Sequence, residues 1–241
     1  PQELAILEPL RGQIPDEVFT QVFKAPVTDG SGMIRDKQLQ ALALLEDAGW
    51  KPDGDKLVNA EGEPLEFTFL NTQNGLERLL LPYKRNLAQI GITLNIRRID
   101  PSQYVNRMMA RDYDMIVIGF PVTTSPGMEL YNYFGSEAAF DPGANNYMVL
   151  KDPAVDSLVE GLINADSRQS LVAHTRALDR VLLAGHYVIP NWHIKTWRVA
   201  YWDRLQHPEV TPLYDVGLMT WWAKPELAQP SPTTAASGTE Q

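Results

Sequence analysis

The histidines of this sequence do not form a catalytic or metal-binding pattern. His174 falls on the apolar face of a helical stretch, three residues after Leu171, which is typical of a structural histidine. His186, His193 and His207 lack metal-ligand spacing, and the sequence contains no cysteine. It also has no HExxH motif, no GxSxG elbow and no glycine-rich phosphate-binding loop. We therefore predict no metal, no cofactor and no catalytic residue.

Carboxylates and tryptophans leave two other functions open. An acidic α/β hydrolase-like enzyme would use Asp114 or Asp100 with a histidine, and it would hold a titrating pair with perturbed pKa values in a pocket. The missing nucleophile motif argues against this enzyme. The other possibility is a protein-interaction domain that docks through its tryptophan-rich C-terminal segment, in which Trp221 and Trp222 are adjacent.

Neutral polar and aromatic side chains gather in two segments that follow predicted strands. In open α/β sheets, ligands bind beyond the carboxyl ends of the strands. Here these ends lead into residues 71–74 and 120–128. Residues 120–147 form a long loop, and loops longer than about 12 to 15 residues usually bind or cover something, the alternative being a surface excursion with no role. We predict that the following side chains face a ligand cleft: Asn71, Gln73, Phe120, Thr123, Thr124, Met128, Asn145, Asn146 and Tyr147. The aromatic rings would supply apolar walls, and the asparagines and threonines would supply hydrogen bonds.

One strand-helix-strand unit is expected to position these loops. Alternating apolar residues from Ile92 to Ile96 predict a strand with one buried face. Asp100 before Pro101 predicts a helix start, and the helix carries an apolar stripe, including Met109, that should pack on a sheet. Residues 114–119 predict a second strand, covered on both faces, which would complete a right-handed βαβ crossover.

Further patterns predict the elements on either side of this unit. They indicate a helix from Asp36 that ends at Gly49, a hairpin at 51–64 and a strand at 65–69. Asn74 with Glu77 predicts a helix cap, although Pro82 would kink that helix or mark its true start. Two amphipathic helices follow, at 155–163 and at 171–182, the second introduced by Asp166.

The composition is that of an ordinary globular protein. The chain has 241 residues, of which 44% are hydrophobic and 21% charged, so it can bury a sizeable core. A formal charge of −9 disfavours nucleic acid as a partner, because nucleic-acid binding needs basic patches. No apolar run approaches the roughly 20 residues that span a bilayer. Since the sequence starts at Pro1 and shows no basic, apolar leader, we interpret it as a fragment or a processed chain.

Three segments resemble a known receptor family. Residues 35–70 carry a helix, an AGW cap and a hairpin, and residues 87–120 carry an IGI strand, an aspartate-capped helix and a YDM strand. Residues 176–192 carry a late helix and the strand that follows it. This combination is similar to the C-terminal lobe of the peptide/nickel class of extracellular solute-binding proteins, the soluble receptors of ABC importers. The segments DEVFTQVF and YDVGLMTWW resemble the Yej-type branch of periplasmic oligopeptide-binding proteins.

The resemblance implies a fold, a function and partners. The fold would be an α/β periplasmic-binding-protein-like lobe, with a mixed sheet and helices on both of its faces, from a two-lobed receptor that closes on its ligand. The protein would not be an enzyme. It would capture oligopeptides or peptide-like solutes in the periplasm and deliver them to ABC permease subunits in the inner membrane. The N-terminal lobe, which this sequence lacks, would be a further partner.

The resemblance also implies an organisation along the chain. Residues 1–34, which look extended and turn-rich, would be an incoming interlobe segment, and residues 35–190 would be the ligand-binding lobe. Residues 191–223 would return in strands toward the N-terminal lobe, and residues 224–241, rich in Pro, Ser, Thr and Ala, would be a disordered tail. Related peptide receptors place an aspartate after the YDM-type strand to pair with the ligand's α-amino group. In this sequence no carboxylate follows that strand until Glu129.

Overall fold

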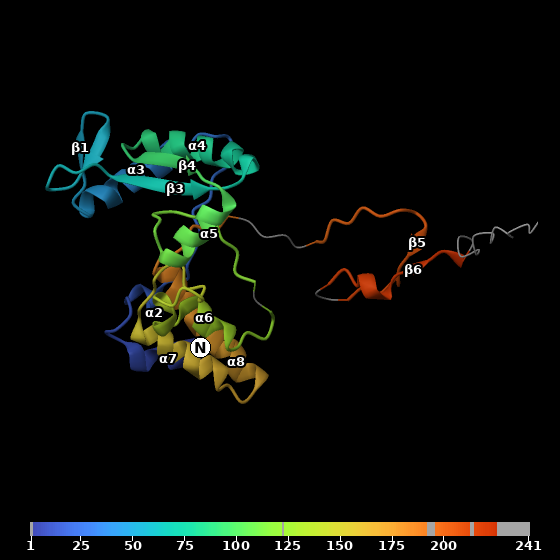
Figure 1. The fold of residues 1–241 in the computed structure, drawn as a ribbon. Coiled ribbons are helices and arrows are strands. Elements are labelled where there is room, and N and C mark those ends of the chain that lie inside the picture. The colour runs from blue at the N-terminus through green and yellow to red at the C-terminus, as the bar shows by residue number, and fades with distance from the viewer. Residues whose placement is uncertain (1, 122, 192–195, 213–214, 226–241) are drawn as a thin grey trace, which may run out of the picture. The chain divides into compact units, whose positions relative to one another are not determined.

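The computed structural model describes residues 2–121, 123–191, 196–212 and 215–225 (Figure 1). The chain divides into two compact units, residues 1–188 and residues 189–241. The larger unit contains, in chain order, α1 (Gln2–Leu7), η1 (Glu8–Leu10), α2 (Glu17–Thr20), α3 (Arg35–Asp47), β1 (Lys51–Asp53), β2 (Lys56–Val58), β3 (Glu66–Asn71), η2 (Asn74–Leu76), α4 (Glu77–Ala88), β4 (Thr93–Arg98), α5 (Pro101–Ala110), α6 (Glu129–Phe134), η3 (Glu137–Ala139), α7 (Pro153–Ile163) and α8 (Arg168–Ala184), where η marks a 3-10 helix. The smaller unit contains β5 (Leu205–Gln206), η4 (Leu218–Thr220) and β6 (Trp222–Ala223).

A parallel pair of strands, β3 and β4, forms the first core. The pairing runs from Glu66 opposite Thr93 to Asn71 opposite Arg98. α4 connects the two strands and packs against β4. The buried side chains of this core are Phe69, Leu80 and Leu94. β1 and β2 form the predicted antiparallel hairpin, so the larger unit has the predicted α/β character with both parallel and antiparallel pairs.

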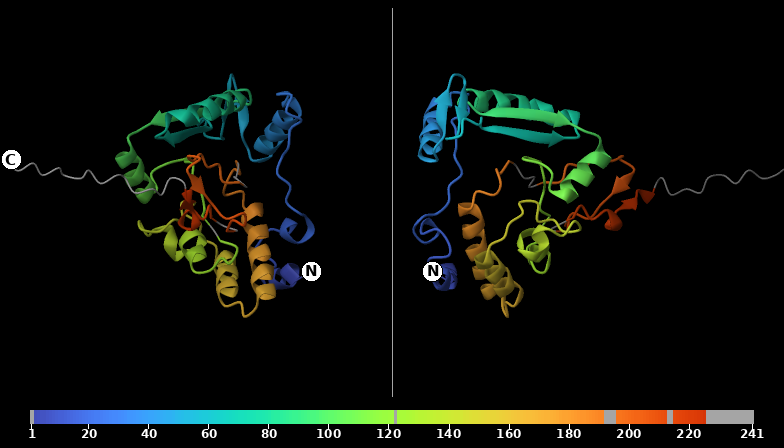
Figure 2. Two further views of the ribbon diagram at one scale, coloured as in Figure 1. Left: turned by 90° about the vertical axis from the view of Figure 1, so that its right-hand side faces the viewer. Right: turned by 60° about the vertical axis from the view of Figure 1, so that its left-hand side comes forward.

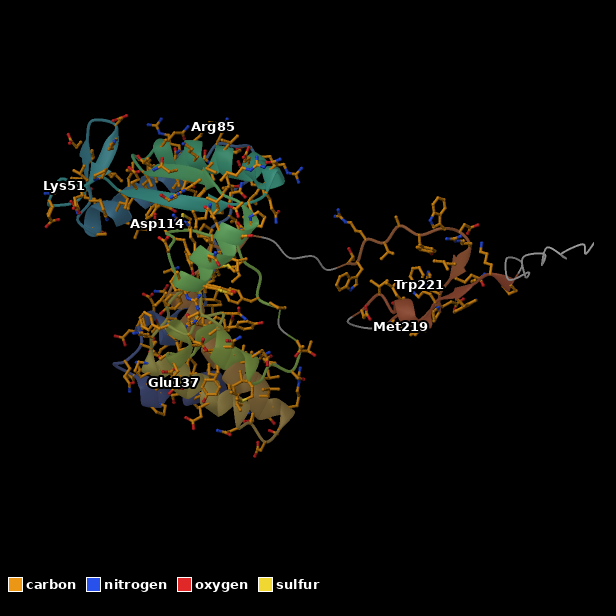
Figure 3. All side chains as sticks on the ribbon, viewed as in Figure 1. Lys51, Arg85, Asp114, Glu137, Met219 and Trp221 are labelled. Carbon is orange, nitrogen blue, oxygen red and sulfur yellow. The ribbon has the colours of Figure 1, made fainter. Side chains whose placement is uncertain are left out.

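The prediction of a strand over residues 114–119 is wrong for the residues after Met115. Met115 forms an isolated parallel bridge with β3, and its amide donates to the Thr68 carbonyl over 3.1 Å. Asp114, which is labelled in Figure 3, accepts through Oδ2 from the Thr68 amide over 2.8 Å, and Tyr104 Oη donates to the Val117 carbonyl over 3.2 Å. Side chains therefore satisfy backbone groups that a longer strand would have paired. β3 lies between β4 and this bridge.

α5 starts where the sequence predicts, but its apolar stripe is not buried as expected. Asp100 Oδ1 accepts from the Gln103 amide over 3.0 Å and Pro101 is the first helical residue, which confirms the predicted N-cap. Val105 and Met109 are 41% and 47% exposed. Because the segment after α5 pairs with β3 at a single bridge, no sheet among the described residues covers these side chains.

Two other helices start at positions that differ from the prediction. α4 begins at Glu77 and runs through Pro82, so a start near Pro82 is wrong, and Asn74 lies in η2 without capping α4. α8 begins after Ser167, whose Oγ accepts from the amide three residues later over 3.1 Å. Ser167 is therefore the N-cap, and the prediction of Asp166 in that role is wrong.

The second core is helical. α1 and α7 both lie against α8 (Figures 1 and 2), and α2 also contacts α8. Leu7, Ile14 and Val18 are buried there together with side chains of α7 and α8. The expectation that residues 1–34 are extended is therefore wrong for residues 2–20. Their helices are one or two turns long, which is too short to show a helical hydrophobic period in the sequence.

The smaller unit is organised around three rings. The rings of Tyr201 and Trp221 meet edge to face with centroids 4.6 Å apart, and His207 Nε2 lies 3.1 Å from Tyr201 Oη. β5 and β6 pair antiparallel, and they are the only strands in the described part of residues 191–223. The prediction of strands from residue 187 onward is wrong for the described residues before β5. Trp192 and residues 226–241, most of the predicted tail, lie outside the described residues.

Candidate ligand-binding site

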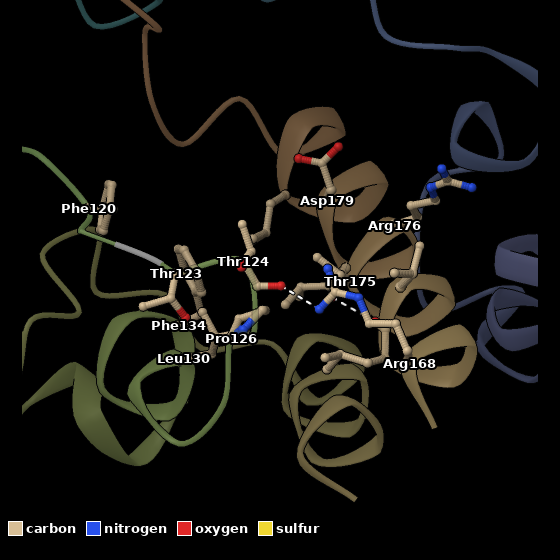
Figure 4. A pocket seen from close by; sticks show the side chains of 14 residues that line it. Phe120, Thr123, Thr124, Pro126, Leu130, Phe134, Arg168, Thr175, Arg176 and Asp179 are labelled. Atoms are coloured by element: carbon tan, nitrogen blue, oxygen red, sulfur yellow. Dashed lines mark hydrogen bonds between the residues drawn. The ribbon is translucent and has the colours of Figure 1, made fainter. Parts of the chain in front are cut away.

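A pocket of about 500 Å³ lies between the segment after the Met115 bridge, α6 and α8 (Figure 4). This volume is in the range of pockets that hold small ligands. Its lining is mostly apolar, with charged groups contributed by α8. The lining residues are Phe120, Thr123, Thr124, Pro126, Leu130, Phe134, Arg168, Leu171, Val172, Thr175, Arg176, Leu178, Asp179 and Leu182.

Aromatic contacts fix the apolar wall. The ring of Phe120 meets Tyr133 edge to face with centroids 5.5 Å apart, and it lies 5.7 Å from the ring of Phe134. Leu130 of α6 is buried beneath this group. Because α6 packs on α7, the wall is anchored to the helical core. The position of Phe120 is thus set by packing rather than by a strand.

Arg168 holds the loop that forms the opposite rim. Its Nη1 donates to the Thr124 carbonyl over 2.6 Å and lies 3.2 Å from Ser125 Oγ (Figure 4). Thr123 Oγ1 accepts from the Ser125 amide over 3.2 Å and donates to the Ser125 carbonyl over 3.0 Å. The Thr123 hydroxyl therefore serves the turn itself, so the predicted hydrogen bond to a ligand would compete with these contacts.

Charged groups enter the pocket from one face of α8. Arg168, Arg176 and Asp179 line it, together with apolar residues spaced three or four apart along the same helix. Burial raises the pKa of Asp179. Within the described ranges, the carboxylate of Asp179 has no hydrogen-bond or ion-pair partner. These three residues were not predicted from the sequence. Their spacing of three or four residues from the apolar residues of α8 indicates that they share one helical face.

Three of the nine residues predicted to face a cleft, namely Phe120, Thr123 and Thr124, line this pocket together. Asn71 is only 2% exposed, and its side chain exchanges two 2.9 Å hydrogen bonds with the backbone of Gln73. The expectation that Asn71 faces a cleft is therefore wrong. Gln73 is exposed, and Met128 is 67% exposed.

Asn146 is fully buried, which contradicts its predicted place in a cleft. Its Nδ2 donates to the carbonyls of Gly135 and Leu150 over 2.9 and 2.8 Å. Its Oδ1 accepts from the Leu150 amide over 2.9 Å. Both N–H groups and the oxygen are thus occupied by backbone, so the side chain braces the segment between α6 and α7.

Asn145 and Tyr147 form a separate network with the segment that follows α5. Tyr147 Oη donates to Asn145 Oδ1 over 2.6 Å, and Tyr113 Oη donates to the Tyr147 carbonyl over 2.6 Å. The guanidinium of Arg111 lies 5.2 Å from the ring centroid of Tyr147 and donates to the Ala144 carbonyl over 2.9 Å. This network connects residues 144–147 with the turn after α5.

The groups considered for catalysis are engaged elsewhere. Asp100 caps α5 and Asp114 accepts from a backbone amide of β3. His174 Nδ1 lies 3.0 Å from the Ser170 carbonyl, one turn earlier in α8. Among the residues described, no group of three or more His, Cys, Asp or Glu could hold a metal ion. No helix in the described ranges is both long and apolar enough to cross a membrane.

Residues 17–141 match the family described as bacterial extracellular solute-binding proteins, family 5 Middle. The chain is 42% identical over 224 residues to the probable peptide-binding protein YejA of Agrobacterium fabrum, covering 92% of this chain and 36% of the relative. It is 37% identical over 238 residues to YejA of Escherichia coli K12, covering 98% of this chain and 39% of the relative. The chain thus spans little more than a third of the length of these relatives.

Solved structures of the same kind share the fold. The oligopeptide-binding protein AppA of Bacillus subtilis, solved with a nonapeptide, superposes with a TM-score of 0.61 at 18% identity, covering 93% of this chain and 45% of AppA. A periplasmic oligopeptide-binding protein of Thermotoga maritima, solved with mannohexaose, gives a TM-score of 0.56 at 17% identity, covering 78% of this chain and 40% of that protein. The predicted fold, an α/β lobe of the periplasmic-binding-protein type, is confirmed.

Proposed function

This chain belongs to the family 5 bacterial extracellular solute-binding proteins, and from that premise we propose that it captures oligopeptides or peptide-like solutes in the periplasm for an ABC importer. The importer's permease subunits in the inner membrane would receive the solute. The relative named as a probable peptide-binding protein, and the fold shared with the oligopeptide-binding protein solved with a nonapeptide, support this proposal.

The observation that carries the proposal is the pocket between Phe120 and α8. Its lining is mostly apolar, with polar groups contributed by two threonines of the loop and by α8, as expected of a site that takes an amino-acid side chain and orients the chain attached to it. It also follows the bridged segment at Met115, where ligands of open α/β sheets bind. We propose that one apolar ligand side chain occupies this pocket.

The free energy gained by burying one ligand side chain in this pocket limits the affinity expected of the chain by itself. Burying one leucine-sized side chain contributes about 1.5 to 3 kcal/mol. A micromolar dissociation constant requires about 8 kcal/mol. The difference must come from hydrogen bonds to the ligand backbone and from a second surface that closes on it. We therefore propose that an N-terminal lobe completes the site, that residues 191–223 lead toward it, and that this chain alone binds peptides weakly.

The rival enzymatic function is disfavoured by the placement of its candidate groups. An acid/base residue needs a free carboxylate within reach of a substrate. Asp100 and Asp114 both accept hydrogen bonds from backbone amides, so both carboxylates have structural roles. We therefore propose binding without catalysis.

Calorimetric titration of short apolar peptides tests this function. The chain would be compared with a fusion in which the N-terminal lobe of the Agrobacterium YejA protein precedes it. We expect at least about tenfold tighter binding by the fusion, because closure adds a second contact surface. Val172→Trp, which fills the pocket, should abolish binding, whereas Leu39→Trp on the exposed side of α3 should leave it unchanged. Turnover of the peptides, or equal binding by Val172→Trp, would contradict the proposal.

A further inference from the structure

Residues 78–99 carry a local charge opposite to that of the whole chain. The stretch contains five cations and no carboxylate, whereas the chain has a formal charge of −9 and all of its 30 Asp and Glu residues lie elsewhere. All five cations are exposed, and none of their side chains forms a hydrogen bond or an ion pair with another described residue. They are Arg78, Lys84 and Arg85 of α4, and Arg97 and Arg98 of β4.

The outward side of α4 combines arginines with an exposed leucine. On its inward side, Leu80 and Leu87 pack into the first core. Arg78, Leu81 and Arg85 are spaced at i, i+3 and i+7, which places them together on the opposite side of the helix. Leu81 is 50% exposed. Two guanidinium groups and an apolar side chain thus form one row along the outside of α4.

Arg98 extends this row at one end of α4. Because α4 connects two parallel strands, it runs against them, and its first turn lies at the end of the layer where β4 also ends (Figure 1). Leu94 of β4 is buried with Leu80 of α4, and Arg98 follows four residues later, on the same side of the strand. Arg78, Leu81, Arg85 and Arg98 therefore share one exposed surface, which we call the α4 surface.

The α4 surface suits an extended anionic partner better than a small anion. Neither the pocket beside Phe120 nor a second one, of about 680 Å³ between α2 and α8, includes a residue of α4 or β4. The cations therefore stand outside both cavities. Leu79, at the border of the α4 surface, is a second partly exposed leucine, at 45%. Cations beside exposed apolar side chains on one helix are typical of proteins that lie on a bilayer, where the cations contact phosphates and the apolar groups insert.

We propose that the α4 surface docks this protein on a bilayer that contains anionic phospholipids, with Arg78, Arg85 and Arg98 at phosphate groups and Leu81 between the headgroups. The carboxylates of the rest of the chain are repelled by the same bilayer, which turns the α4 surface toward it. Each engaged cation strengthens binding about fivefold, the factor that corresponds to about 1 kcal/mol. The inference goes beyond peptide capture and does not depend on it, because no residue of the ligand pocket takes part.

Vesicle flotation tests this docking with the 241-residue chain. The chain would be mixed with vesicles of phosphatidylcholine alone, or of phosphatidylcholine and phosphatidylglycerol in equal parts, and the bound fraction would be measured from about 20 to about 500 mM NaCl. The test variant is Arg78→Gln with Arg85→Gln. The matched control is Lys51→Gln with Lys56→Gln, which removes the same charge from the exposed β1–β2 hairpin. Figure 3 shows Lys51 and Arg85 well apart. Circular dichroism would check that both variants fold.

We expect the chain to bind the phosphatidylglycerol vesicles, to leave the phosphatidylcholine vesicles unbound and to be released by high salt. The double arginine variant should bind about 25-fold more weakly, and the double lysine variant at most about twofold more weakly. Absent binding, equal binding to both kinds of vesicle, or unchanged binding by the arginine variant would overturn the proposal. Retention of the chain on immobilised polyglutamate without vesicle binding would also overturn it, and would identify an acidic protein as the partner of the α4 surface.

Discussion

Replacement of Asn146 by alanine tests the distinction between a bracing residue and a ligand contact. Asn146 is fully buried and makes three hydrogen bonds of 2.8 to 2.9 Å, all to backbone groups of Gly135 and Leu150. Each such bond contributes about 1 kcal/mol net, so Asn146→Ala should lower the free energy of unfolding by about 3 kcal/mol. For a unit of this size, about 3 kcal/mol corresponds to a melting temperature lower by roughly 6 to 12 °C.

Urea unfolding followed by circular dichroism measures this change. Asn106→Ala is the matched control, because Asn106 is exposed on α5, and its free energy of unfolding should change by less than about 0.5 kcal/mol. Peptide affinity, measured under native conditions, should be the same in Asn146→Ala and the unsubstituted chain. A loss of less than about 1 kcal/mol in the free energy of unfolding, combined with lost peptide binding, would contradict the bracing role and indicate that Asn146 contacts the ligand.

Three further predictions concern single side chains. Arg168→Ala should weaken peptide binding about 3- to 10-fold with little loss of stability, because its bond to the Thr124 carbonyl holds the exposed rim, and isothermal titration would detect the change. The raised pKa of Asp179 means that the folded state holds the proton more tightly than the unfolded state, so stability should fall as pH rises from about the ordinary value of 3.8 through the raised value. In Asp179→Asn this decline in the urea midpoint should be smaller, and an unchanged pH profile would contradict it. Asp100→Ala should cost about 1 kcal/mol through loss of the bond from the Gln103 amide, measured by urea unfolding, and an unchanged midpoint would remove this cap from the account.

Local signals in the sequence predicted local structure well. Asp100, Pro101 and Gln103 specify a helix start among neighbours in the chain, and the structure forms that cap. Gly49 likewise has a positive φ of 91° two residues after the end of α3, as its type predicts for a residue ending a helix. Such features depend on a few consecutive residues, so their sequence pattern suffices.

The candidate site depends on contacts that the sequence does not display. Asn145 and Asn146 are adjacent and chemically identical. Asn145 nevertheless accepts a hydrogen bond from Tyr147 Oη, whereas the side chain of Asn146 forms its hydrogen bonds with backbone groups. The partnership of Phe120 with α8 joins residues about fifty positions apart, and helical periodicity alone shows that Asp179 shares a face with Leu171 or Leu182 but not what that face meets. Strand propensity at 114–119 was overridden where side chains took the backbone partners of a longer strand, since Asp114 accepts from the Thr68 amide of β3 and Tyr104 donates to the Val117 carbonyl.

Photo-crosslinking tests most directly whether the pocket between Phe120 and α8 receives the ligand. A tripeptide carrying a diazirine analogue of leucine would be irradiated with the chain, and the modified residues would be identified by mass spectrometry. Our account predicts label on the pocket lining, at Phe120, Leu130, Leu171 or Leu182, and competition by the unmodified peptide. Competed label concentrated at Asn145 and Tyr147, or on the hairpin of β1 and β2, with none on the pocket lining, would contradict it.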